Sequence, residues 1–354
     1  MKTGKTITLL AALFLLASLI APMHASAEKL MLRVPVCFNS NLPVIGDSAL
    51  WIADNLKTIS NGEIVMKVFE PGKLLPPFEI LDAVSQGKVN AGLASAAYWQ
   101  GKLPAASFFS TVPFGPEAPE YLAWIFHGNG LKLYQEMYDN AGYNVKVLPA
   151  QLISPETSGW FAKPVNSLDD LKGLRMRFFG FGGKVMEKLG VSVSLMPAGE
   201  IFPALEKGAI DATEFSFPAI DEKLGFYKIV KYNYFPGWHQ QSTLLEFLIN
   251  KDVWNKLPEY QQKMIEMTTM ACLTHTLAYC EAIQGEVIKE NATKHGVQNM
   301  KWSDEMLDAY KKAWNEVADE EAAKDPFFKK VWDDMKAFRE NYSYWSSYGF
   351  LPRK

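Results

Sequence analysis

The chain has 354 residues, enough for two domains of ordinary size, and its 48% hydrophobic, 21% charged and 13% aromatic residues are typical of a globular protein. Its 36 basic and 39 acidic residues give a net charge of −3, which argues against nucleic acid as a partner. Beyond the first 27 residues, no stretch has the length of a transmembrane segment without charge or proline.

Residues 1–27 are predicted to be a cleaved signal peptide. Lys2 and Lys5 precede an apolar run at residues 7–20, which is shorter than the ~20 apolar residues of a comfortable membrane span. Ala25-Ser26-Ala27 supplies the small residues that a signal peptidase needs, and no cysteine follows for a lipid anchor. The mature protein is therefore expected to be exported; an uncleaved anchor is the alternative.

A 13-residue pattern occurs twice, at residues 79–91 and 200–212, with five identical and three conservatively replaced positions. Each copy predicts a short helix stopped by a glycine, Gly87 or Gly208, and then an apolar strand that ends at Asn90 or Asp211. A helix that closes at glycine and leads into a buried strand is an α/β unit. Two such units predict two lobes with a cleft between them.

The first half of the chain alternates strand and helix patterns around the first copy of the repeat. The polar stretch 151–158, which leads into Gly159, is interpreted as the crossing into the second lobe. The predicted elements are a strand at 30–36, a helix at 43–60, a strand at 64–69, a helix at 117–140 and a strand at 145–149.

In the second half, Ser167 is expected to cap a helical turn with Asp170 at its third position. A strand at 174–179 places Arg175 and Arg177 on one face, because side chains alternate along a strand. The further predictions are helices at 180–189, 258–291, 303–323 and 326–342, and strands at 228–234 and 244–250. The helix at 258–291 is long enough to brace both lobes.

Ordered motifs over about 80 residues resemble the periplasmic solute-binding proteins of TRAP transporters, the DctP-like family. The motifs are Gly159-Trp160-Phe161, residues 168–173, Arg177, Leu189-Gly190, Pro197, residues 199–201, Ala204-Leu205, Gly208, residues 210–212 and Glu214. Residues 224–238 resemble the branch that binds 2-oxo acids and related monocarboxylates.

This resemblance implies an α/β fold of two lobes, with a hinge of crossing strands and a long helix that braces both. The first lobe would comprise residues 28–150, with about 239–257 returning to it, and the second lobe residues 151–238; residues 258–354 would form the long helix and the C-terminal helices. The implied function is to bind a small organic anion in the periplasm by lobe closure and to deliver it to the small and large membrane subunits of a permease. The resemblance implies no catalytic activity. The protein is expected to be a monomer or a homodimer.

Arg177 stands where the family's carboxylate-binding arginine stands, and a guanidinium offers two parallel donors to a carboxylate. In the 2-oxo acid branch, a glutamine, a tryptophan and a glutamate are associated with a cation that bridges to the ligand. The matching positions here hold Glu156, Phe215 and Gln240, so the glutamine and the glutamate are exchanged.

Two interpretations of this exchange remain open. Oxygen atoms of Glu156, Gln240 and the Phe215 backbone, with Glu214 nearby, would still suit Na⁺ or Ca²⁺. Alternatively, Glu156 would receive the ammonium group of an amino acid while Arg177 takes its carboxylate. Other residues expected to contact the ligand are Phe38, Asn39, Tyr98, Phe215 and Trp238.

Other chemistries have weaker sequence support. The glycines of residues 180–183 lack the third glycine of a dinucleotide fingerprint, and a secreted enzyme would have only Glu156 or Glu214 as a general base. Presentation of the ligand to a sensor kinase remains an alternative to transport.

Cys272 and Cys280 would lie about 12 Å apart along one helix, too far for a disulfide, and Cys37 has no obvious partner.

Overall fold

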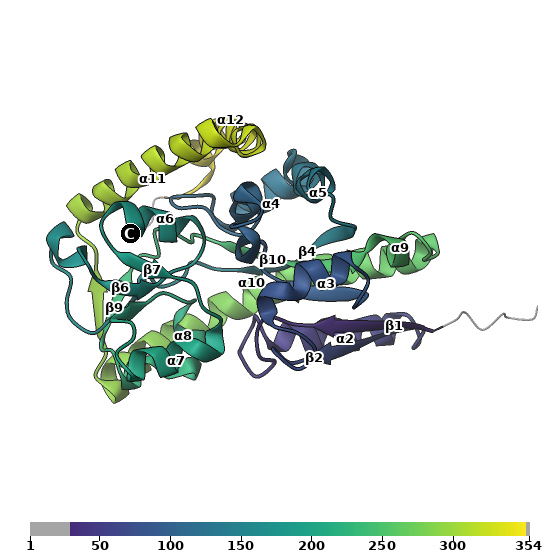
Figure 1. Cartoon of the computed structure of the whole chain (residues 1–354), viewed down its shortest axis with the longest axis horizontal. Coiled ribbons are helices and arrows are strands. Elements are labelled where there is room, and N and C mark those ends of the chain that lie inside the picture. Colours follow the sequence, from purple (N-terminus) through teal and green to yellow (C-terminus); the bar gives the residue numbers. More distant parts are fainter. Residues whose placement is uncertain (1–28, 352–354) are drawn as a thin grey trace, which may run out of the picture.

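The computed structural model describes residues 29–351, so the predicted signal peptide lies outside the described residues. The strands form a two-stranded, a three-stranded and a six-stranded sheet. One β-bridge joins the first two, which are described together as the first sheet. The first sheet and the six-stranded second sheet, each flanked by helices, lie side by side along the long axis of the molecule (Figure 1). Within residues 29–351, no helix is long and apolar enough to cross a membrane.

The first sheet is built on a β-α-β-α-β unit. β1 pairs in parallel with β2, and a parallel bridge from Val36 to Leu93 joins β1 to β3, so the spatial order is β2-β1-β3. The elements are β1 (Leu30–Pro35), α2 (Asp47–Ile59), β2 (Ile64–Phe69), η1 (Pro77–Glu79), α3 (Ile80–Ser85) and β3 (Ala91–Ala94). Helix α2 begins four residues later than predicted, because residues 42–46 form turns in which Val44 has a positive φ of 67°.

Two antiparallel strands complete this sheet: β10 (Thr243–Asn250) pairs with β3 on one side and with β4 (Val145–Ile153) on the other. Between β3 and β4 lie η2 (Ala96–Trp99), η3 (Pro104–Phe109), α4 (Ala118–His127) and α5 (Gly130–Asn140). The single helix predicted at 117–140 was wrong. The chain breaks at Gly128, where a Cβ atom would lie 2.7 Å from the Trp124 carbonyl oxygen.

The second sheet repeats the plan of the first. β6 pairs in parallel with β7 and β8, and β5 then joins β8 to β9 through antiparallel pairs. The elements are β5 (Gly159–Phe161), η4 (Leu168–Leu171), β6 (Arg175–Arg177), α6 (Gly180–Lys188), β7 (Ser192–Ser194), α7 (Ala198–Glu206), β8 (Ala212–Thr213), α8 (Pro218–Leu224), η5 (Phe226–Lys228), β9 (Tyr232–Phe235) and β11 (Gln298–Lys301). The strand predicted at 228–234 was wrong in its first half, where η5 ends. The predicted cap of Ser167 on η4 is confirmed.

The two copies of the repeat occupy matching places, before β3 and before β8. Gly87 and Gly208 have positive φ angles of 71° and 65°, as a glycine that ends a helix requires. The predicted strand ends were wrong, because Asn90 and Asp211 precede their strands. Asn90 Oδ1 accepts a hydrogen bond from the Arg33 backbone N–H on β1, and Asp211 Oδ2 accepts one from that of Arg175 on β6. In both units this side chain fixes the neighbouring strand.

Two segments connect the sheets: residues 154–158 run from β4 to β5, and residues 236–242 run from β9 to β10. The Glu156 N–H donates to the Gln240 carbonyl at 3.2 Å, so the segments are hydrogen-bonded to each other. A Cβ atom on Gly237 would lie 2.2 Å from the Glu156 carbonyl oxygen, so only glycine permits this close approach. These two crossing segments carry Glu156 and Gln240.

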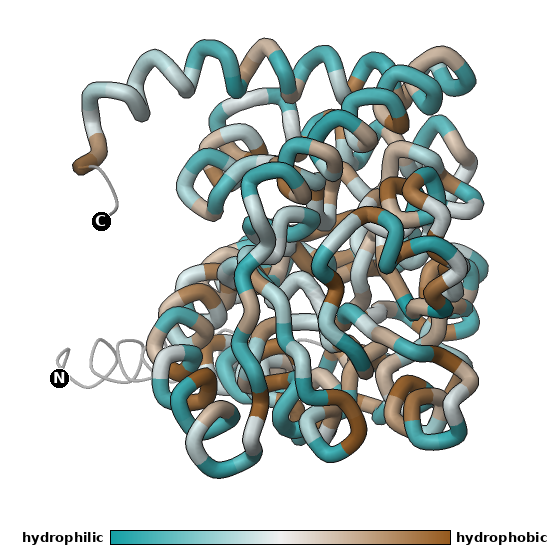
Figure 2. Tube along the Cα trace, turned by 90° about the vertical axis from the view of Figure 1, so that its left-hand side faces the viewer, coloured by the Kyte–Doolittle hydropathy of each residue, from teal (hydrophilic) through white to brown (hydrophobic). Residues whose placement is uncertain are grey.

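The long helix α10 (Glu259–His295) follows α9 (Lys251–Trp254) and runs diagonally across both parts of the molecule in Figure 1. It contacts α2 and β4 of one part and α8 and β11 of the other, which confirms the predicted bracing helix. On the opposite side lie α11 (Asp304–Lys324) and α12 (Pro326–Gly349); α12 runs seven residues beyond its predicted end and projects from the molecule in Figure 2. All three cysteines are free and buried.

Candidate functional site

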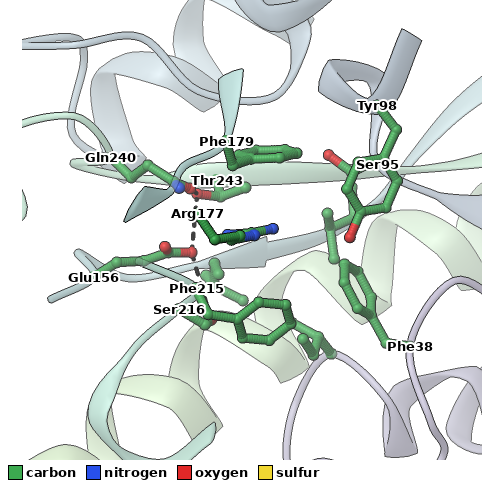
Figure 3. A pocket seen from close by; sticks show the side chains of 13 residues that line it. Phe38, Ser95, Tyr98, Glu156, Arg177, Phe179, Phe215, Ser216, Gln240 and Thr243 are labelled. Atoms are coloured by element: carbon green, nitrogen blue, oxygen red, sulfur yellow. Dashed lines mark hydrogen bonds between the residues drawn. The ribbon is translucent and has the colours of Figure 1, made fainter. Parts of the chain in front are cut away.

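A small cavity, with a volume of about 30 Å³ for the centres of water-sized probes, lies between the two sheets, at the carboxyl ends of β3, β6 and β8 (Figure 3). Ligands of α/β folds bind outside such strand ends, where loops rather than strands form the wall. The residues that line the cavity are Phe38, Ile45, Ser95, Tyr98, Ile153, Glu156, Arg177, Phe179, Phe215, Ser216, Gln240, Thr243 and Leu245.

Arg177, the last residue of β6, is 1% exposed. Its Nη1 donates to the Glu214 carbonyl at 2.7 Å and to Glu214 Oε2 at 3.1 Å, and its Nε donates to the Met196 carbonyl at 3.3 Å. Among the described residues, none accepts a hydrogen bond from Nη2. The guanidinium is therefore held rigidly on one side and keeps donors for a ligand on the other.

Glu214 is the buried partner that holds this arginine. Its Oε2 also accepts from the Phe179 backbone N–H at 3.0 Å, and its Oε1 accepts from Gln240 Nε2 at 3.1 Å. Burial alone would raise the pKa of Glu214, but the charge of Arg177, assisted by His239 and the Phe179 N–H, outweighs it and lowers the pKa. Glu214 is thus ionised and committed to Arg177, so it serves as a positioning group.

Glu156 is the carboxyl group that lines the cavity, and it has few partners. Oε1 has only weak contacts with the hydroxyls of Ser216 and Thr243, both at 3.5 Å, and Oε2 is buried without any hydrogen-bond partner. Burial, followed by the negative charges of Glu214 and Asp221, raises its pKa well above the ordinary value. A cationic group would stabilise a buried carboxyl group that has so few hydrogen-bond partners.

Gln240 lies beside Glu156 on the other crossing segment. Its Oε1 accepts from the Thr243 hydroxyl at 2.6 Å, while its amide nitrogen donates to Glu214. Hydrogen bonds at both its oxygen and its nitrogen therefore orient the amide. Gln240 and Glu156 lie on the same side of the cavity in Figure 3.

Aromatic rings enclose the guanidinium. The Phe215 and Phe179 ring centroids lie 5.1 Å and 5.9 Å from Arg177 Cζ, one on each side in Figure 3. From the first sheet, Phe38 and Tyr98 close the cavity, and the Phe38 ring meets Phe215 edge-on at 6.2 Å. The rings of the two parts thus touch around the arginine and exclude water from it.

The structure brings most of the predicted ligand residues together, with two corrections. Asn39 is not among the lining residues; it lies in the loop before α2, where its carbonyl accepts a hydrogen bond from the Leu42 N–H. Trp238 is a core residue, stacked on Tyr310 at 4.7 Å and on Phe114 at 5.7 Å. Both follow strand ends in the sequence, but loop geometry turns them away from the cavity. Seven further lining residues were not predicted from the sequence: Ile45, Ser95, Ile153, Phe179, Ser216, Thr243 and Leu245.

The residues present fit a hard cation. Oxygen atoms are the ligands such ions prefer, and Glu156 Oε2 is a buried carboxyl oxygen without a partner. Gln240 Oε1 adds an amide oxygen, and within residues 29–351 no hydrogen-bond donor reaches the Phe215 carbonyl. Glu214, by contrast, already faces Arg177 and two further donors, so the predicted metal role suits it less well.

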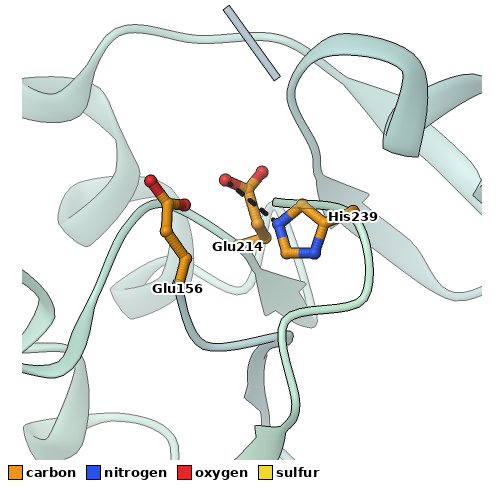
Figure 4. Close-up of side chains that lie close together, drawn as sticks. All are labelled: Glu156, Glu214 and His239. Carbon is orange, nitrogen blue, oxygen red and sulfur yellow. Dashed lines mark ion pairs between the residues drawn. The ribbon is translucent and has the colours of Figure 1, made fainter. Parts of the chain in front are cut away.

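Glu156 and Glu214 also form a cluster with His239, with one ligand atom of each within 4.8 Å of the others (Figure 4). His239 Nε2 lies 3.8 Å from Glu214 Oε1, and neither ring nitrogen has a hydrogen-bond partner among the described residues. Its ring packs edge-on against Phe178 at 4.9 Å and does not line the cavity. His239 therefore lies beside the carboxyl groups of Glu156 and Glu214 but outside the cavity that a ligand would occupy.

Residues 38–325 match the family model of the bacterial extracellular solute-binding proteins, family 7, also called DctP. The match covers most of the chain, and this protein belongs to that family. The fold agrees, since it is the two-lobed periplasmic binding-protein architecture of the family's solved structures.

Three relatives are informative. The chain is 38% identical to the monocarboxylate 2-oxoacid-binding periplasmic protein of Nostoc sp. PCC 7120 over 295 aligned residues. The alignment covers 83% of this chain and 80% of that protein. It superposes with a TM-score of 0.88 at 32% identity on a TRAP transporter solute-binding protein of Bordetella bronchiseptica RB50, over 91% of this chain and 95% of that one. That structure is a dimer of mixed occupancy, with copurified calcium and picolinate in one site and an apo second site. A Pseudoalteromonas atlantica T6c protein with bound sodium and pyruvate gives 0.87 at 31% identity, over 91% and 97% of the two chains.

Proposed function

We propose that this protein is the extracytoplasmic receptor of a TRAP transporter and binds a small 2-oxo or 2-hydroxy monocarboxylate. One observation carries the proposal: the rigidly held Arg177 keeps unpaired guanidinium donors in a closed aromatic cavity. A guanidinium fork binds a carboxylate through two parallel hydrogen bonds, which fixes the orientation of the ligand. The Nostoc relative, named for binding such acids, supports this ligand class.

The charges around the cavity favour a cation beside the ligand. Arg177 is already neutralised by Glu214, so a bound acid would add a negative charge near Glu156 and Asp221. Na⁺ or Ca²⁺ held by Glu156, Gln240 Oε1 and the Phe215 carbonyl would offset it and supply positive charge to the ligand's oxygens. The sodium with pyruvate and the calcium with picolinate in two relatives support this arrangement.

An amino-acid ligand is the second candidate, and the Glu156 Oε2 atom also favours this ligand. Glu156 Oε2 lacks a partner inside a buried wall, and an ammonium group would satisfy it as well as a metal ion would. Arg177 would then hold the carboxylate of a zwitterion, whose net charge is zero. No metal would be needed in this case.

Unfolding and refolding the protein removes any copurified ligand and allows the two candidates to be separated. Titration calorimetry with pyruvate-type acids and with amino acids, each with and without Ca²⁺ or Na⁺, would follow. The main proposal predicts tight binding of the acids that weakens when the metal is chelated. Metal-independent binding of amino acids alone would replace it with the second candidate.

Delivery to a membrane permease follows from the proposed family role. Closure would bring residues 28–150, with 239–257, against residues 151–238 about the two crossing segments, and the small and large permease subunits would receive the closed form. Periplasmic relatives support export through the predicted signal peptide. Genes for the two membrane subunits beside this one would favour transport over presentation to a sensor kinase. A monomer and a homodimer both suit this role, and the dimeric Bordetella relative supports the latter.

We further propose that the protein is not an enzyme. A general base must be free to take a proton from a bound substrate, yet Glu214 is engaged by Arg177, Gln240 and a backbone N–H. Glu156 is the remaining candidate and has the cation or ammonium role above. Recovery of chemically intact ligand after prolonged incubation is the expected result; accumulation of a product would show turnover.

A further inference from the structure

Asp221, on helix α8, carries a buried carboxyl group that lies next to the candidate site but does not line the cavity. Its Oδ1 accepts a hydrogen bond from the Ser216 backbone N–H at 3.1 Å. Its Oδ2 accepts from Trp160 Nε1 at 2.8 Å and from the Thr157 hydroxyl at 3.2 Å. Three donors therefore converge on one carboxyl group, which is the arrangement that suits a carboxylate, since it only accepts hydrogen bonds.

These hydrogen bonds join the two segments that carry the proposed cation ligands. Thr157 directly follows Glu156, and Ser216 directly follows Phe215. The Thr157 N–H also donates to the Ser216 carbonyl at 3.1 Å, so the segments are hydrogen-bonded to each other as well as to Asp221. Asp221 thus helps to fix where the Glu156 carboxyl group lies relative to the Phe215 carbonyl group.

The hydrogen bond to Ser216 also sets the direction of the Phe215 carbonyl. The peptide bond between these two residues is trans, so its C=O and N–H groups point in opposite directions. Because the Ser216 N–H points to Asp221, the Phe215 carbonyl oxygen points away from Asp221. Phe215 and Ser216 line the cavity, whereas Asp221 does not. The carbonyl oxygen is therefore directed toward the cavity.

We propose that Asp221 is a positioning residue for the bound cation: it turns the Phe215 carbonyl toward the cavity and strengthens that oxygen as a ligand. The inference rests on the proposed function, because it needs a cation beside the bound acid. A carboxylate that accepts from the N–H of a peptide group polarises that group and makes its oxygen more negative. Replacing a group that orients the ligands of a metal ion typically lowers the metal affinity by roughly 10- to 100-fold.

The charge of Asp221 also acts on the cation directly. Coulomb energy is proportional to the product of the two charges, so a nearby carboxylate stabilises Ca²⁺ about twice as much as Na⁺. Burial raises the pKa of Asp221 well above its ordinary value, whereas a bound cation lowers it, because positive charge favours the carboxylate form. Measurements at pH 8 favour this form further.

The Kd values for Ca²⁺ and for Na⁺, each measured with the refolded protein in excess pyruvate at pH 8, test the proposal. Asp221→Asn keeps the size of the side chain and removes its charge. The Kd for Ca²⁺ is expected to rise about tenfold and that for Na⁺ about threefold, because the Coulomb energy of Na⁺ is half as large.

Glu246→Gln is the matched control. Glu246 is also buried and also accepts from an indole N–H and from hydroxyl groups, but it lies in β10, outside the two segments that carry the cation ligands. Both Kd values should stay unchanged in this variant.

Thr157→Val is the second variant, because it removes one hydrogen bond to Asp221 without changing the shape of the side chain. Its Kd for Ca²⁺ should rise about threefold, and this variant decides the question if Asp221→Asn does not fold. Unchanged Kd values, or equal rises for both cations in Asp221→Asn, would overturn the positioning role and leave the proposed function intact. A wild type that binds pyruvate equally well with and without cations would remove the cation from the proposed function, and this inference with it.

Discussion

The two β-α-β-α-β units, residues 30–94 and 175–213, share one backbone plan and differ in the chemistry at their strand ends. In both, the first strand lies between the other two, and all three run in parallel. The strands of the first unit are followed by the rings of Phe38 and Tyr98. The strands of the second unit also lead to rings, Phe179 and Phe215, but they carry the charges of Arg177 and Glu214 as well. The first unit therefore supplies enclosure alone, and the second supplies enclosure and charge recognition.

The repeated 13-residue pattern itself contributes nothing to the cavity wall. Its glycines end helices, and Asn90 and Asp211 hold the backbone of the neighbouring strand. The repeat therefore belongs to the shared scaffold, whereas the residues just after each strand differ between the two units.

Replacement of Arg177 should have the largest effect. Arg177→Lys keeps the positive charge but loses the planar fork, and we expect the Kd for the acid to rise about 100-fold, which is about 2.7 kcal/mol. Titration calorimetry measures this change. Arg175→Lys is the matched control on the same strand, because Arg175 is exposed and pairs with Asp211. An equal loss in both variants would contradict the assignment.

Loss of the whole side chain needs a compensated variant. Arg177→Ala would leave Glu214 buried and unpaired, at a cost of about 3–5 kcal/mol in stability. In Arg177→Met/Glu214→Gln the charges are removed together, so the fold should survive while the ligand no longer raises the Tm. A persistent thermal shift in a folded double variant would contradict the role of the arginine.

The exchanged pair on the crossing segments gives the next effect. Glu156→Gln removes the cavity carboxylate, and we expect acid affinity in the presence of Ca²⁺ to fall roughly tenfold to hundredfold, because ligand charge sets cation affinity. Glu156→Gln/Gln240→Glu restores one carboxylate and one amide and should recover most of the loss. If the double variant does not recover acid binding and has also lost amino-acid binding, the result would favour the role of Glu156 in binding an ammonium group.

Among the buried glutamates, Glu214 and Glu246 have pKa values that move in opposite directions. Glu214 has Arg177 beside it, whereas Glu246 on β10 accepts hydrogen bonds from the neutral donors Trp99, Tyr134 and Tyr138. Burial therefore raises the pKa of Glu246 to about 6. Its carboxylate form costs the fold about 2 kcal/mol at neutral pH.

The sign of the pH dependence follows from this raised pKa. Below pH about 4.5 the carboxyl is protonated in both the folded and unfolded states; as pH rises through about 6, the stabilisation due to the protonated form is lost. Glu246→Gln should remove about 2 kcal/mol of that decline, measured by urea unfolding at pH 4.5 and pH 7. The exposed Glu206→Gln control should leave the decline unchanged. An unaltered decline in Glu246→Gln would contradict the assignment.

The smallest expected effect comes from the aromatic wall of the first unit. Phe38→Ala should weaken acid binding by about 1 kcal/mol, because the ring excludes water from Arg177 but offers no charge. The cation dependence of binding should stay unchanged. A loss as large as that of Arg177→Lys would show that recognition is shared between the units.

Local patterns were enough to predict the fold class, the long helix and the capped turn at Ser167. The repeat predicted two related units, because the glycine stop and the buried strand are encoded within 13 residues. Element limits were wrong where local turn geometry decides them. Helix α4 ends before Gly128, where a Cβ atom would lie 2.7 Å from the Trp124 carbonyl oxygen, and residues 42–46 form turns before α2 begins.

The candidate site shows the same limit. Arg177, Glu156 and Gln240 were predicted from a family resemblance, and they do converge on one cavity. Phe179 and Thr243 were missed. Phe179 follows Arg177 by two residues, so alternation along the strand was an available signal for it, whereas no pattern marks Thr243, the first residue of β10. Asn39 and Trp238 follow strand ends in the sequence, and no pattern indicates which loop residue turns toward the cavity.

A crystal structure of the refolded protein grown with pyruvate and Ca²⁺ would locate the acid and the cation. Both carboxylate oxygens are expected within hydrogen-bond distance of the Arg177 guanidinium, and the cation is expected on oxygens of Glu156, Gln240 and Phe215. An acid bound elsewhere, with the Arg177 donors turned to other protein groups, would contradict the role assigned to Arg177.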